Sequence, residues 1–228
     1  MRLENMVRRY AVIDQRDGWE AGHAQLTDAE RAEWSHLRNP SRRRVWLAAR
    51  QLGKQLIVDR VPGAPQDHGL IEILSRDFAA PHKSVRPTVS FSGKPQPWSL
   101  SISHTDESVL VALSTNPHVR VGVDLCRRSR VPDGFLQTWF TPAERANVRG
   151  EGFDGPMRLW AAKEALYKAL NSGEGFAPHA IEVHWRDGGA RCTYRNQLMD
   201  DAIGLETWNV DQHLAVLVTV NKFQEHRS

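Results

Sequence analysis

Cysteine is scarce in this sequence, and long apolar segments are missing. Only Cys126 and Cys192 occur among 228 residues, too far apart for a CxxC zinc site or a dense set of disulfides. The longest wholly apolar runs have five residues, whereas a membrane-spanning helix needs ~20, so we expect no membrane segment. An acid and arginines stand where a signal peptide would carry its apolar stretch, so the expected location is the cytoplasm.

Several common enzyme motifs are also absent. The sequence has no HExxH zinc motif, no GxxxxGK phosphate loop, no GxGxxG dinucleotide loop and no GxSxG nucleophile elbow. These absences argue against zinc hydrolases, nucleoside triphosphatases and serine hydrolases. With 40% hydrophobic and 25% charged residues, the chain is expected to fold as one or two globular domains.

A nucleic-acid binder is one alternative. Arg42–Arg44 and the segment Arg127–Arg130 are basic, and eight tryptophans could stack on bases. The net charge is only +3, and Trp46 and Trp160 fall inside predicted helices, where packing is the expected role. We therefore expect no nucleic acid among the partners.

The first half of the chain predicts helices followed by strands. A capping-box pattern at Thr27 and Glu30 begins one helix, and Ser41 is expected to cap a longer one. Spacing and alternation of apolar residues predict the remaining elements. They are helices over 27–38, 41–58 and 70–78 and adjacent strands at 99–104, 109–113 and 119–126.

The long helix carries a second stripe beside its apolar one. Arg43, Arg50 and Lys54 project within a narrow arc of this helix. We therefore expect three cationic heads on one side, offered to an anionic ligand.

The second half of the chain repeats a capping box at Thr141 and Glu144. Helices are predicted from 141 and over 157–170, and strands at 181–185, 191–194, 205–210 and 214–220, the first two joined by a turn at 187–189. Helices and strands mix without regular βαβ alternation, which indicates the α+β class. A break near Arg120 would give two domains, residues 1–120 and 121–228.

Asp124 is the first candidate for chemistry. In a strand, Gly122, Asp124 and Cys126 face one way, which places a carboxylate beside a glycine that lets another backbone or a ligand come close. A single Asp at a strand end is more often a turn or cap residue, and this strand alone does not decide between the two.

The helix over 157–170 supplies a second candidate. Lys163, Glu164 and Lys168 occupy an arc beside its buried stripe, so two cations flank one carboxylate. The alternative is an exposed face with an ordinary i,i+4 pair between Glu164 and Lys168.

A third set consists of Lys94, in a Gly-Lys-Pro loop, and the neighbours Ser103 and His104. A cationic head and hydroxyl donors suit a phosphate. Ser103 and His104 point to opposite faces of a strand, so they are poorly placed as a nucleophile and its base.

Taken in order, these pieces resemble the Sfp-type 4′-phosphopantetheinyl transferases. They read Gly-Lys-Pro, Ser-Ile-Ser-His, Val-Gly-Val-Asp and Trp-Ala-Ala-Lys-Glu-Ala-Leu-Tyr-Lys, from Lys94 to Lys168. The resemblance implies two similar α/β halves related by a pseudo-twofold axis, with the ligand in the cleft between them. It also implies a monomeric, Mg2+-dependent enzyme that moves the 4′-phosphopantetheine arm of coenzyme A to a serine of an apo acyl or peptidyl carrier protein, releasing adenosine 3′,5′-bisphosphate.

The resemblance further implies a role for each matched residue. Asp124 and Glu164 would bind the metal, Glu164 would also be the candidate base for the serine hydroxyl, and Lys168 would contact the transferred phosphate. Contacts to coenzyme A are implied for Lys94, Ser103, His104, Lys163, Lys168, Arg43, Arg44 and Arg50.

Cys126 departs from the family pattern, which commonly has a second acid there. A thiol is a poor ligand for Mg2+. We expect a small half-buried residue with water completing the metal shell, and a soft-metal or redox ligand is the alternative. A coenzyme A-binding protein without transferase activity therefore stays open as a second function. Arg127, Arg128 and Arg130 form either a docking site for an acidic carrier or a solvated basic loop.

Overall fold

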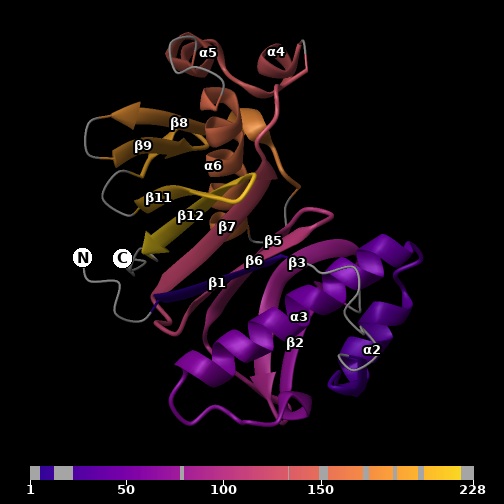
Figure 1. Ribbon diagram of the computed structural model, residues 1–228. Coiled ribbons are helices and arrows are strands. Elements are labelled where there is room, and N and C mark those ends of the chain that lie inside the picture. The colour runs from indigo at the N-terminus through magenta and orange to yellow at the C-terminus, as the bar shows by residue number, and fades with distance from the viewer. Residues whose placement is uncertain are drawn as a thin grey trace. The chain divides into compact units, whose positions relative to one another are not determined.

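A computed structural model gives the fold (Figure 1). It describes residues 6–12, 23–77, 80–132, 134–148, 154–171, 175–186, 189–199 and 203–221. Within these residues, no helix combines the length and apolar character needed to cross a membrane. The chain divides into two compact units, Met1–Pro117 with Asn171–Gly173 (unit 1) and His118–Leu170 with Glu174–Ser228 (unit 2). The predicted break near Arg120 lies beside this division.

Unit 1 contains a long helix and two three-stranded antiparallel sheets. The sheet orders are β1-β6-β5 and β2-β3-β4. The elements are β1 (Met6–Val12), α2 (Asp28–Ser35), α3 (Pro40–Arg60), η1 (His68–Leu70), β2 (Ile71–Asp77), β3 (Ala80–Phe91), β4 (Lys94–Pro95), β5 (Ser99–His104) and β6 (Ser108–Ser114).

Unit 2 contains the same kinds of helices and sheets as unit 1, together with one additional short helix. Its sheet orders are β11-β12-β7 and β10-β9-β8. The elements are β7 (Val119–Arg127), α4 (Phe135–Trp139), α5 (Pro142–Val148), α6 (Gly155–Leu170), η2 (Pro178–Ala180), β8 (Ile181–Arg186), β9 (Gly189–Tyr194), β10 (Gln197–Leu198), β11 (Ile203–Val210) and β12 (His213–Asn221).

The two units repeat one order of elements. Each runs from a strand through a short capped helix and a long helix to a 3-10 turn, a hairpin, a two-residue strand and two final strands. In each, the last strand pairs with both the first strand and the strand before it, so β1, β6 and β5 correspond to β7, β12 and β11. The predicted α+β class is confirmed, and the repeated order of elements agrees with the two similar halves that the resemblance implies.

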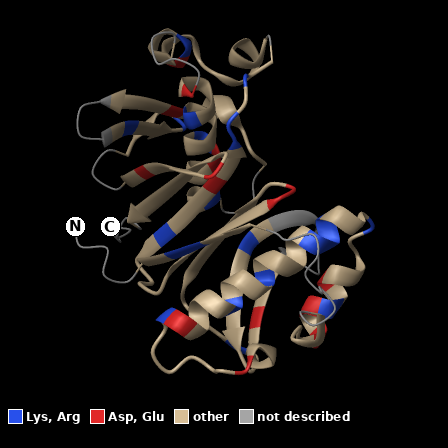
Figure 2. Ribbon diagram, viewed as in Figure 1, with Lys and Arg blue, Asp and Glu red and all other residues tan. Residues whose placement is uncertain are grey.

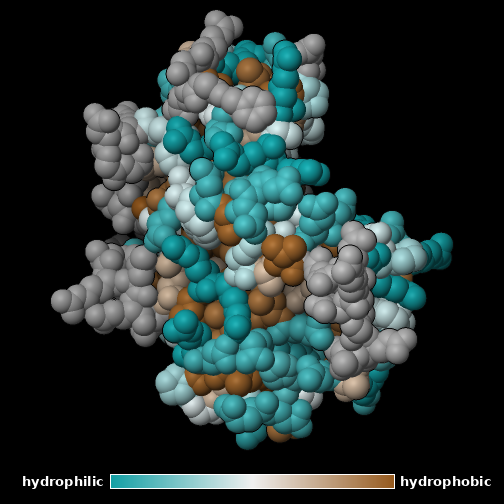
Figure 3. All heavy atoms as spheres, viewed as in Figure 1, coloured by the Kyte–Doolittle hydropathy of each residue, from teal (hydrophilic) through white to brown (hydrophobic). Residues whose placement is uncertain are grey.

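Each unit has its own apolar core beneath its long helix. In unit 1, α3 packs Val45, Ala49 and Leu56 onto sheet residues that include Val111. In unit 2, α6 packs Leu159 and Leu166 onto a sheet face that includes Val216 and Val218. Both helices show the amphipathic stripe expected from the 3.6-residue period. Hydrophilic side chains cover most of the face shown in Figure 3.

Most predicted elements are confirmed, including both capping boxes, but the helix predicted over 70–78 is wrong. Residues Ile71–Asp77 form β2, which pairs with β3. Leu70 and Leu74 have helical spacing, yet Ile71 and Ile73 alternate into the core and are fully buried. The β-branched pair at period two therefore outweighs the helical pattern. Phe78, the last residue of that prediction, lies outside the described residues.

Three smaller differences concern the ends and partners of elements. Asn39, not Ser41, caps α3, because its side chain accepts the Ser41 and Arg42 N–H groups and Pro40 takes the first helical position. The strands at 99–104 and 109–113 are adjacent, but the strand at 119–126 pairs with β12 instead. The turn at 187–188 lies outside the described residues. β1 was not predicted.

Candidate active site

A glycine sets how closely the two elements of the site approach. A Cβ added at Gly122 of β7 would lie 1.9 Å from the Ala165 carbonyl oxygen and 2.7 Å from the Ala169 nitrogen of α6. The sequence left open whether Gly122 makes room for another backbone or for a ligand, and the structure shows another backbone there. Only a residue without Cβ lets α6 lie this near the strand.

Asp124, Glu164 and Lys168, which we call the acid–lysine site, lie together where β7 meets α6. The Lys168 ammonium donates to Asp124 Oδ1 at 2.6 Å and lies 3.8 Å from Glu164 Oε2. Glu164 and Lys168 are one turn apart on α6, so they share one side of the helix. The structure therefore brings the two predicted carboxylates to a single cation.

Burial changes the electrostatics of this site. Asp124 is 6% exposed, whereas Glu164 and Lys168 are half-buried. Burial raises the pKa of the Glu164 carboxyl above its ordinary value, and the charge of Asp124 raises it further while Lys168 opposes the shift. Two carboxylates thus compete for the positive charge of one ammonium.

This donor set fits a hard divalent cation. Asp124 and Glu164 offer carboxylate oxygens, which Mg2+ prefers, and both carboxylates lie near the ammonium of Lys168. No group of three or more His, Cys, Asp or Glu side chains suited to a metal occurs among the described residues. Two protein ligands are compatible with Mg2+, since this ion usually keeps several waters.

Cys126 follows Asp124 on the same side of β7 but is not set up as a metal ligand. Its Sγ lies 3.9 Å from the Met157 carbonyl and 3.7 Å from the Leu214 carbonyl, oriented as a weak donor to both. Burial, and then the charge of Asp124, raises the pKa of the thiol to about 12. The thiol therefore stays protonated near neutral pH, as expected for a small half-buried residue.

Lys163 precedes Glu164 on α6 but points into the interior of unit 2. Its side chain is fully buried, and its ammonium donates to Glu144 Oε2 at 2.6 Å and to the Trp139 carbonyl at 3.2 Å. Burial lowers the pKa of this lysine, and Glu144 opposes the shift. The coenzyme A contact implied for Lys163 stays a prediction.

The expectation that α3 offers three cationic heads on one side is wrong for two of them. Arg50 is 2% exposed and pairs with Glu33 at 3.0 Å, and Lys54 is 1% exposed and pairs with Glu30 at 2.6 Å. Helical spacing showed their direction but not the acids of α2 that cover them. The lysines and arginines of α3 can be followed in Figure 2.

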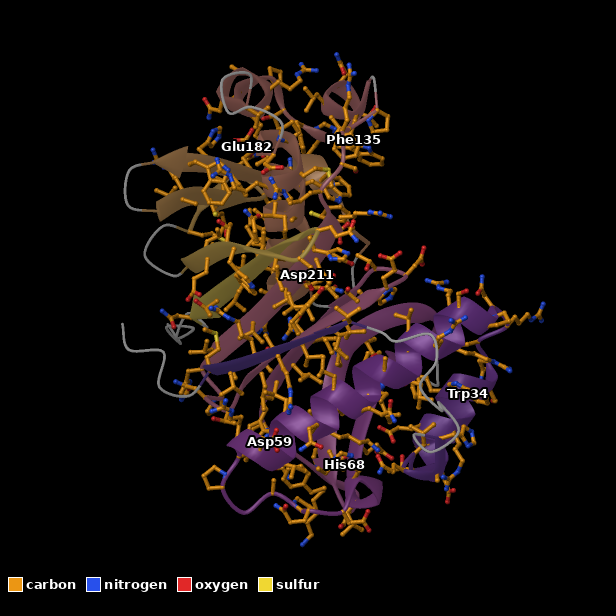
Figure 4. The ribbon with its side chains drawn as sticks, in the orientation of Figure 1. Trp34, Asp59, His68, Phe135, Glu182 and Asp211 are labelled. Atoms are coloured by element: carbon orange, nitrogen blue, oxygen red, sulfur yellow. The ribbon has the colours of Figure 1, made fainter. Side chains whose placement is uncertain are left out.

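The remaining basic candidates of α3 are at its first turns. Arg43 is half-buried, stacks on Trp34 at 4.5 Å from the ring centroid and donates to the Leu37 carbonyl. Arg44 is half-buried too. Trp34, on α2, is labelled in Figure 4. Arg43 is thus held in place by unit 1 itself, and contacts of Arg43, Arg44 and Arg50 with coenzyme A stay predictions.

Lys94, Ser103 and His104 lie on β4 and β5 of unit 1. Lys94 is exposed, Ser103 is 5% exposed and His104 is exposed at the end of its strand. Ser103 and His104 are successive residues of a paired strand and point to opposite faces, as predicted. These three candidates belong to a different unit from the acid–lysine site.

Trp160, the first residue of the Trp-x-x-Lys-Glu run, has the packing role expected for it. Its ring meets Phe135, Trp139 and Phe176 edge-on, with centroids 5.4 to 5.5 Å apart. Phe135 is labelled in Figure 4. This aromatic cluster anchors α6 against α4.

The predicted basic loop after β7 is exposed, and two of its arginines have partners. Arg128 pairs with Asp154 at 2.5 Å, and Arg127 donates to the Gln212 side chain. Carrier docking at this loop stays a prediction.

Sequence reasoning did not find the buried acids of the short helices. Glu30 and Glu144 were recognised only as capping residues, although each also pairs with a buried lysine of the long helix. The signal was present in the sequence, because each capping-box acid is followed by a lysine on the next long helix.

Comparisons with known proteins agree with this geometry. Residues 120–218 match the family model of the 4′-phosphopantetheinyl transferase superfamily, so the resemblance inferred from the sequence is confirmed for this segment. The L-aminoadipate-semialdehyde dehydrogenase-phosphopantetheinyl transferase of Mus musculus is 27% identical over 149 residues, covering 60% of this chain and 45% of the relative. The chain thus matches less than half the length of that protein.

Several solved structures also match this chain. One of them is the holo-(acyl-carrier-protein) synthase of Helicobacter pylori in complex with coenzyme A, with 19% identity and a TM-score of 0.38. The match covers 44% of this chain and 99% of that one.

Proposed function

From the match of residues 120–218 to the family model of the 4′-phosphopantetheinyl transferase superfamily, we propose that the chain transfers the 4′-phosphopantetheine arm of coenzyme A to a serine of an apo acyl or peptidyl carrier protein. Adenosine 3′,5′-bisphosphate is the second product. The observation that carries the proposal is the meeting of Asp124, Glu164 and Lys168 inside the matched segment. Transfer of a phosphoryl group to a hydroxyl needs chiefly positioning and charge neutralisation, which these three side chains would supply.

Mg2+ is the proposed metal, held by Asp124 and Glu164. When bound, it would neutralise charge on the pyrophosphate of coenzyme A. The pairing of both acids with Lys168 supports this assignment, because the same oxygens already attract a cation.

Glu164 is the proposed acceptor for the proton of the attacking serine hydroxyl, directly or through water. Glu164 is half-buried beside Asp124 and Lys168, and a carboxylate oxygen that the metal does not take would accept this proton. Lys168 would place its ammonium on the negative charge that develops at the transferred phosphate.

Unit 1 is proposed to supply contacts to the nucleotide end of coenzyme A. Lys94 and His104 are exposed and have the chemistry to bind phosphate oxygens, and Arg43 is already oriented by Trp34. We further propose that the exposed arginines after β7 meet the acidic surface of the carrier, and that the protein is cytoplasmic and monomeric.

The test is incubation with apo carrier protein, coenzyme A and Mg2+, followed by intact mass of the carrier. We expect a phosphopantetheine mass increase with the natural chain and a loss of at least 100-fold in rate with Glu164→Gln. The matched control is Glu107→Gln, which makes the same change at an exposed glutamate between β5 and β6. If several carrier types gain no mass while coenzyme A still binds, the chain is a coenzyme A-binding protein without transferase activity.

A further inference from the structure

Two lysines, Lys54 and Lys163, are buried in the same way in the two units. Lys54 of α3 is 1% exposed and Lys163 of α6 is fully buried. Each ammonium lies 2.6 Å from one glutamate oxygen, that of Glu30 or Glu144. Buried charges are retained only when they are paired and hydrogen-bonded, so each pair is a built feature of its unit.

The two glutamates make matching sets of contacts. Glu144 accepts the Thr141 N–H and the Val183 N–H, both at 3.0 Å, in addition to Lys163. Glu30 accepts the N–H groups of Thr27 and Ile73, both at 2.9 Å, in addition to Lys54. Each glutamate therefore joins a short helix, a long helix and the first strand of a hairpin.

Each lysine also makes contacts that fix it from other sides. Lys163 donates to the Trp139 carbonyl and lies 5.4 Å from the centre of the Phe140 ring. Lys54 donates to the carbonyls of Gln25 and His68 at 2.8 and 2.9 Å. Both ammonium groups are thus held by their own units.

Unit 1 has a buried lysine–glutamate pair like that of unit 2, although its residues at the positions that match the acid–lysine site carry different charges. Counting from the buried lysine, Glu164 and Lys168 correspond to Gln55 and Asp59. Asp59 pairs with Arg9 of β1, the strand that corresponds to β7, and accepts from Gln55 at 2.6 Å. We call Arg9, Gln55 and Asp59 the reversed-charge trio. Asp59 is labelled near the end of α3 in Figure 4.

The comparison of the units separates framework from chemistry. The reversed-charge trio places a cation on the strand and an acid on the helix, the opposite of Asp124 and Lys168. It has no pair of acids for a metal and no lysine for a phosphate, yet the buried Lys54–Glu30 pair is present. The buried pair therefore serves the packing of the long helix and does not depend on a ligand.

We propose that Lys163 is a positioning residue that fixes the rotation of α6 about its axis, so that Glu164 and Lys168 face Asp124. Lys163 is then not a ligand of coenzyme A, which revises the role implied by the resemblance. The proposal rests on the proposed function only for its kinetic readout.

The test compares Lys163→Met with the double variant Lys163→Met/Glu144→Gln. The single variant leaves Glu144 buried without its lysine, so its urea midpoint should fall clearly. The double variant should regain part of the loss, because the amide that replaces the Glu144 carboxylate carries no charge but can accept only one of the two backbone N–H groups. In the double variant we expect the Kd for coenzyme A to stay within twofold of the natural chain. The kcat for transfer should fall about 10- to 100-fold, because the site is less well fixed.

Lys54→Met and Lys54→Met/Glu30→Gln are the matched controls. They should show the same loss and recovery of the urea midpoint, with a smaller change in kcat than their counterparts in unit 2. A coenzyme A Kd weakened tenfold or more in both Lys163 variants would identify Lys163 as a ligand and overturn the proposal. An unchanged kcat in the stable double variant would also overturn it.

A structural readout separates this proposal from the proposed function. If the natural chain transfers nothing, the proposed function fails, and a crystal structure of the double variant decides the role of Lys163. We expect the 2.6 Å contact between Lys168 and Asp124 to lengthen beyond 3.5 Å. An unchanged contact would overturn the proposal.

Discussion

Replacing Gly122 with alanine should damage the acid–lysine site without touching any of its three side chains. The new Cβ would lie 1.9 Å from the Ala165 carbonyl oxygen, a backbone atom that no rotamer change can move. The two groups must separate by about 1 Å to reach even the 3.0 Å below which such contacts are essentially not seen. Helix α6 and strand β7 must therefore move apart.

The expected magnitude follows from that displacement. Forcing an extra methyl into a packed contact costs about 1–3 kcal/mol of unfolding free energy. The lower entropy of the unfolded alanine chain returns about 0.4–1 kcal/mol. We expect a net loss of about 1–2 kcal/mol. The transfer rate should fall about 100-fold, because a displacement of 1 Å at a reacting centre costs about that factor.

The assay combines urea unfolding with the initial rate of carrier modification at saturating coenzyme A. Gly175→Ala is the matched control, because its added Cβ meets nothing within 4 Å. The control should stay within about 0.5 kcal/mol of the natural chain and keep its activity. A Gly122→Ala variant with natural stability and rate would refute the role given to the close approach of α6.

Three further predictions concern single side chains. Because the folded pKa of Glu164 lies above its ordinary 4.5, its ionised form lowers stability as pH rises past that value. Without Mg2+, Glu164→Gln should thus have a larger free energy of unfolding than the natural chain at pH 7 and the same one below the ordinary pKa. Urea unfolding across pH measures this free energy. A difference between the two chains that does not change with pH would contradict the prediction. Cys126→Glu should lower the Mg2+ concentration for half-maximal activity about tenfold in a titration, since a third carboxylate joins the site, and no tightening would mean that the metal shell is not limited there. Arg130→Glu should raise the KM for carrier severalfold and leave the Kd for coenzyme A unchanged, whereas Arg60→Glu, on α3, serves as the charge-matched control; an unchanged KM would remove the docking role.

Much of this fold could be predicted from local patterns, because the deciding interactions are local. The capping boxes at Thr27 and Thr141 fix helix starts within four residues, and the short apolar runs of β6 and β12 are typical of strands buried on both faces. β2 was predicted as a helix because its pairing with β3 is a tertiary contact that spacing does not contain. The same limit hid the pairing of β7 with β12, which joins segments about 90 residues apart.

For the site, too, the residues within local motifs could be predicted, and the tertiary contacts could not. Asp124, Glu164 and Lys168 could be found because each stands in a motif whose residues the chain brings together through one glycine contact. Helical spacing placed Arg50 on a cationic stripe and the resemblance implied a ligand contact for Lys163, but neither source shows what covers a side chain. Their covering acids, Glu33 and Glu144, come from neighbouring short helices. Only packing shows which cations are already neutralised.

The reversed-charge trio bears on how many metal ions one polypeptide would bind. An arginine beside an aspartate leaves no surplus negative charge, so a divalent ion gains little at Arg9 and Asp59. We hence expect one divalent ion per polypeptide. If both units carried the acids of the acid–lysine site, two ions would bind, and a metal titration would show two steps. Among the described residues, the repeated framework thus carries opposite charge orders in its two copies, and only the order at Asp124 and Lys168 leaves a second acid, Glu164, for the proposed metal.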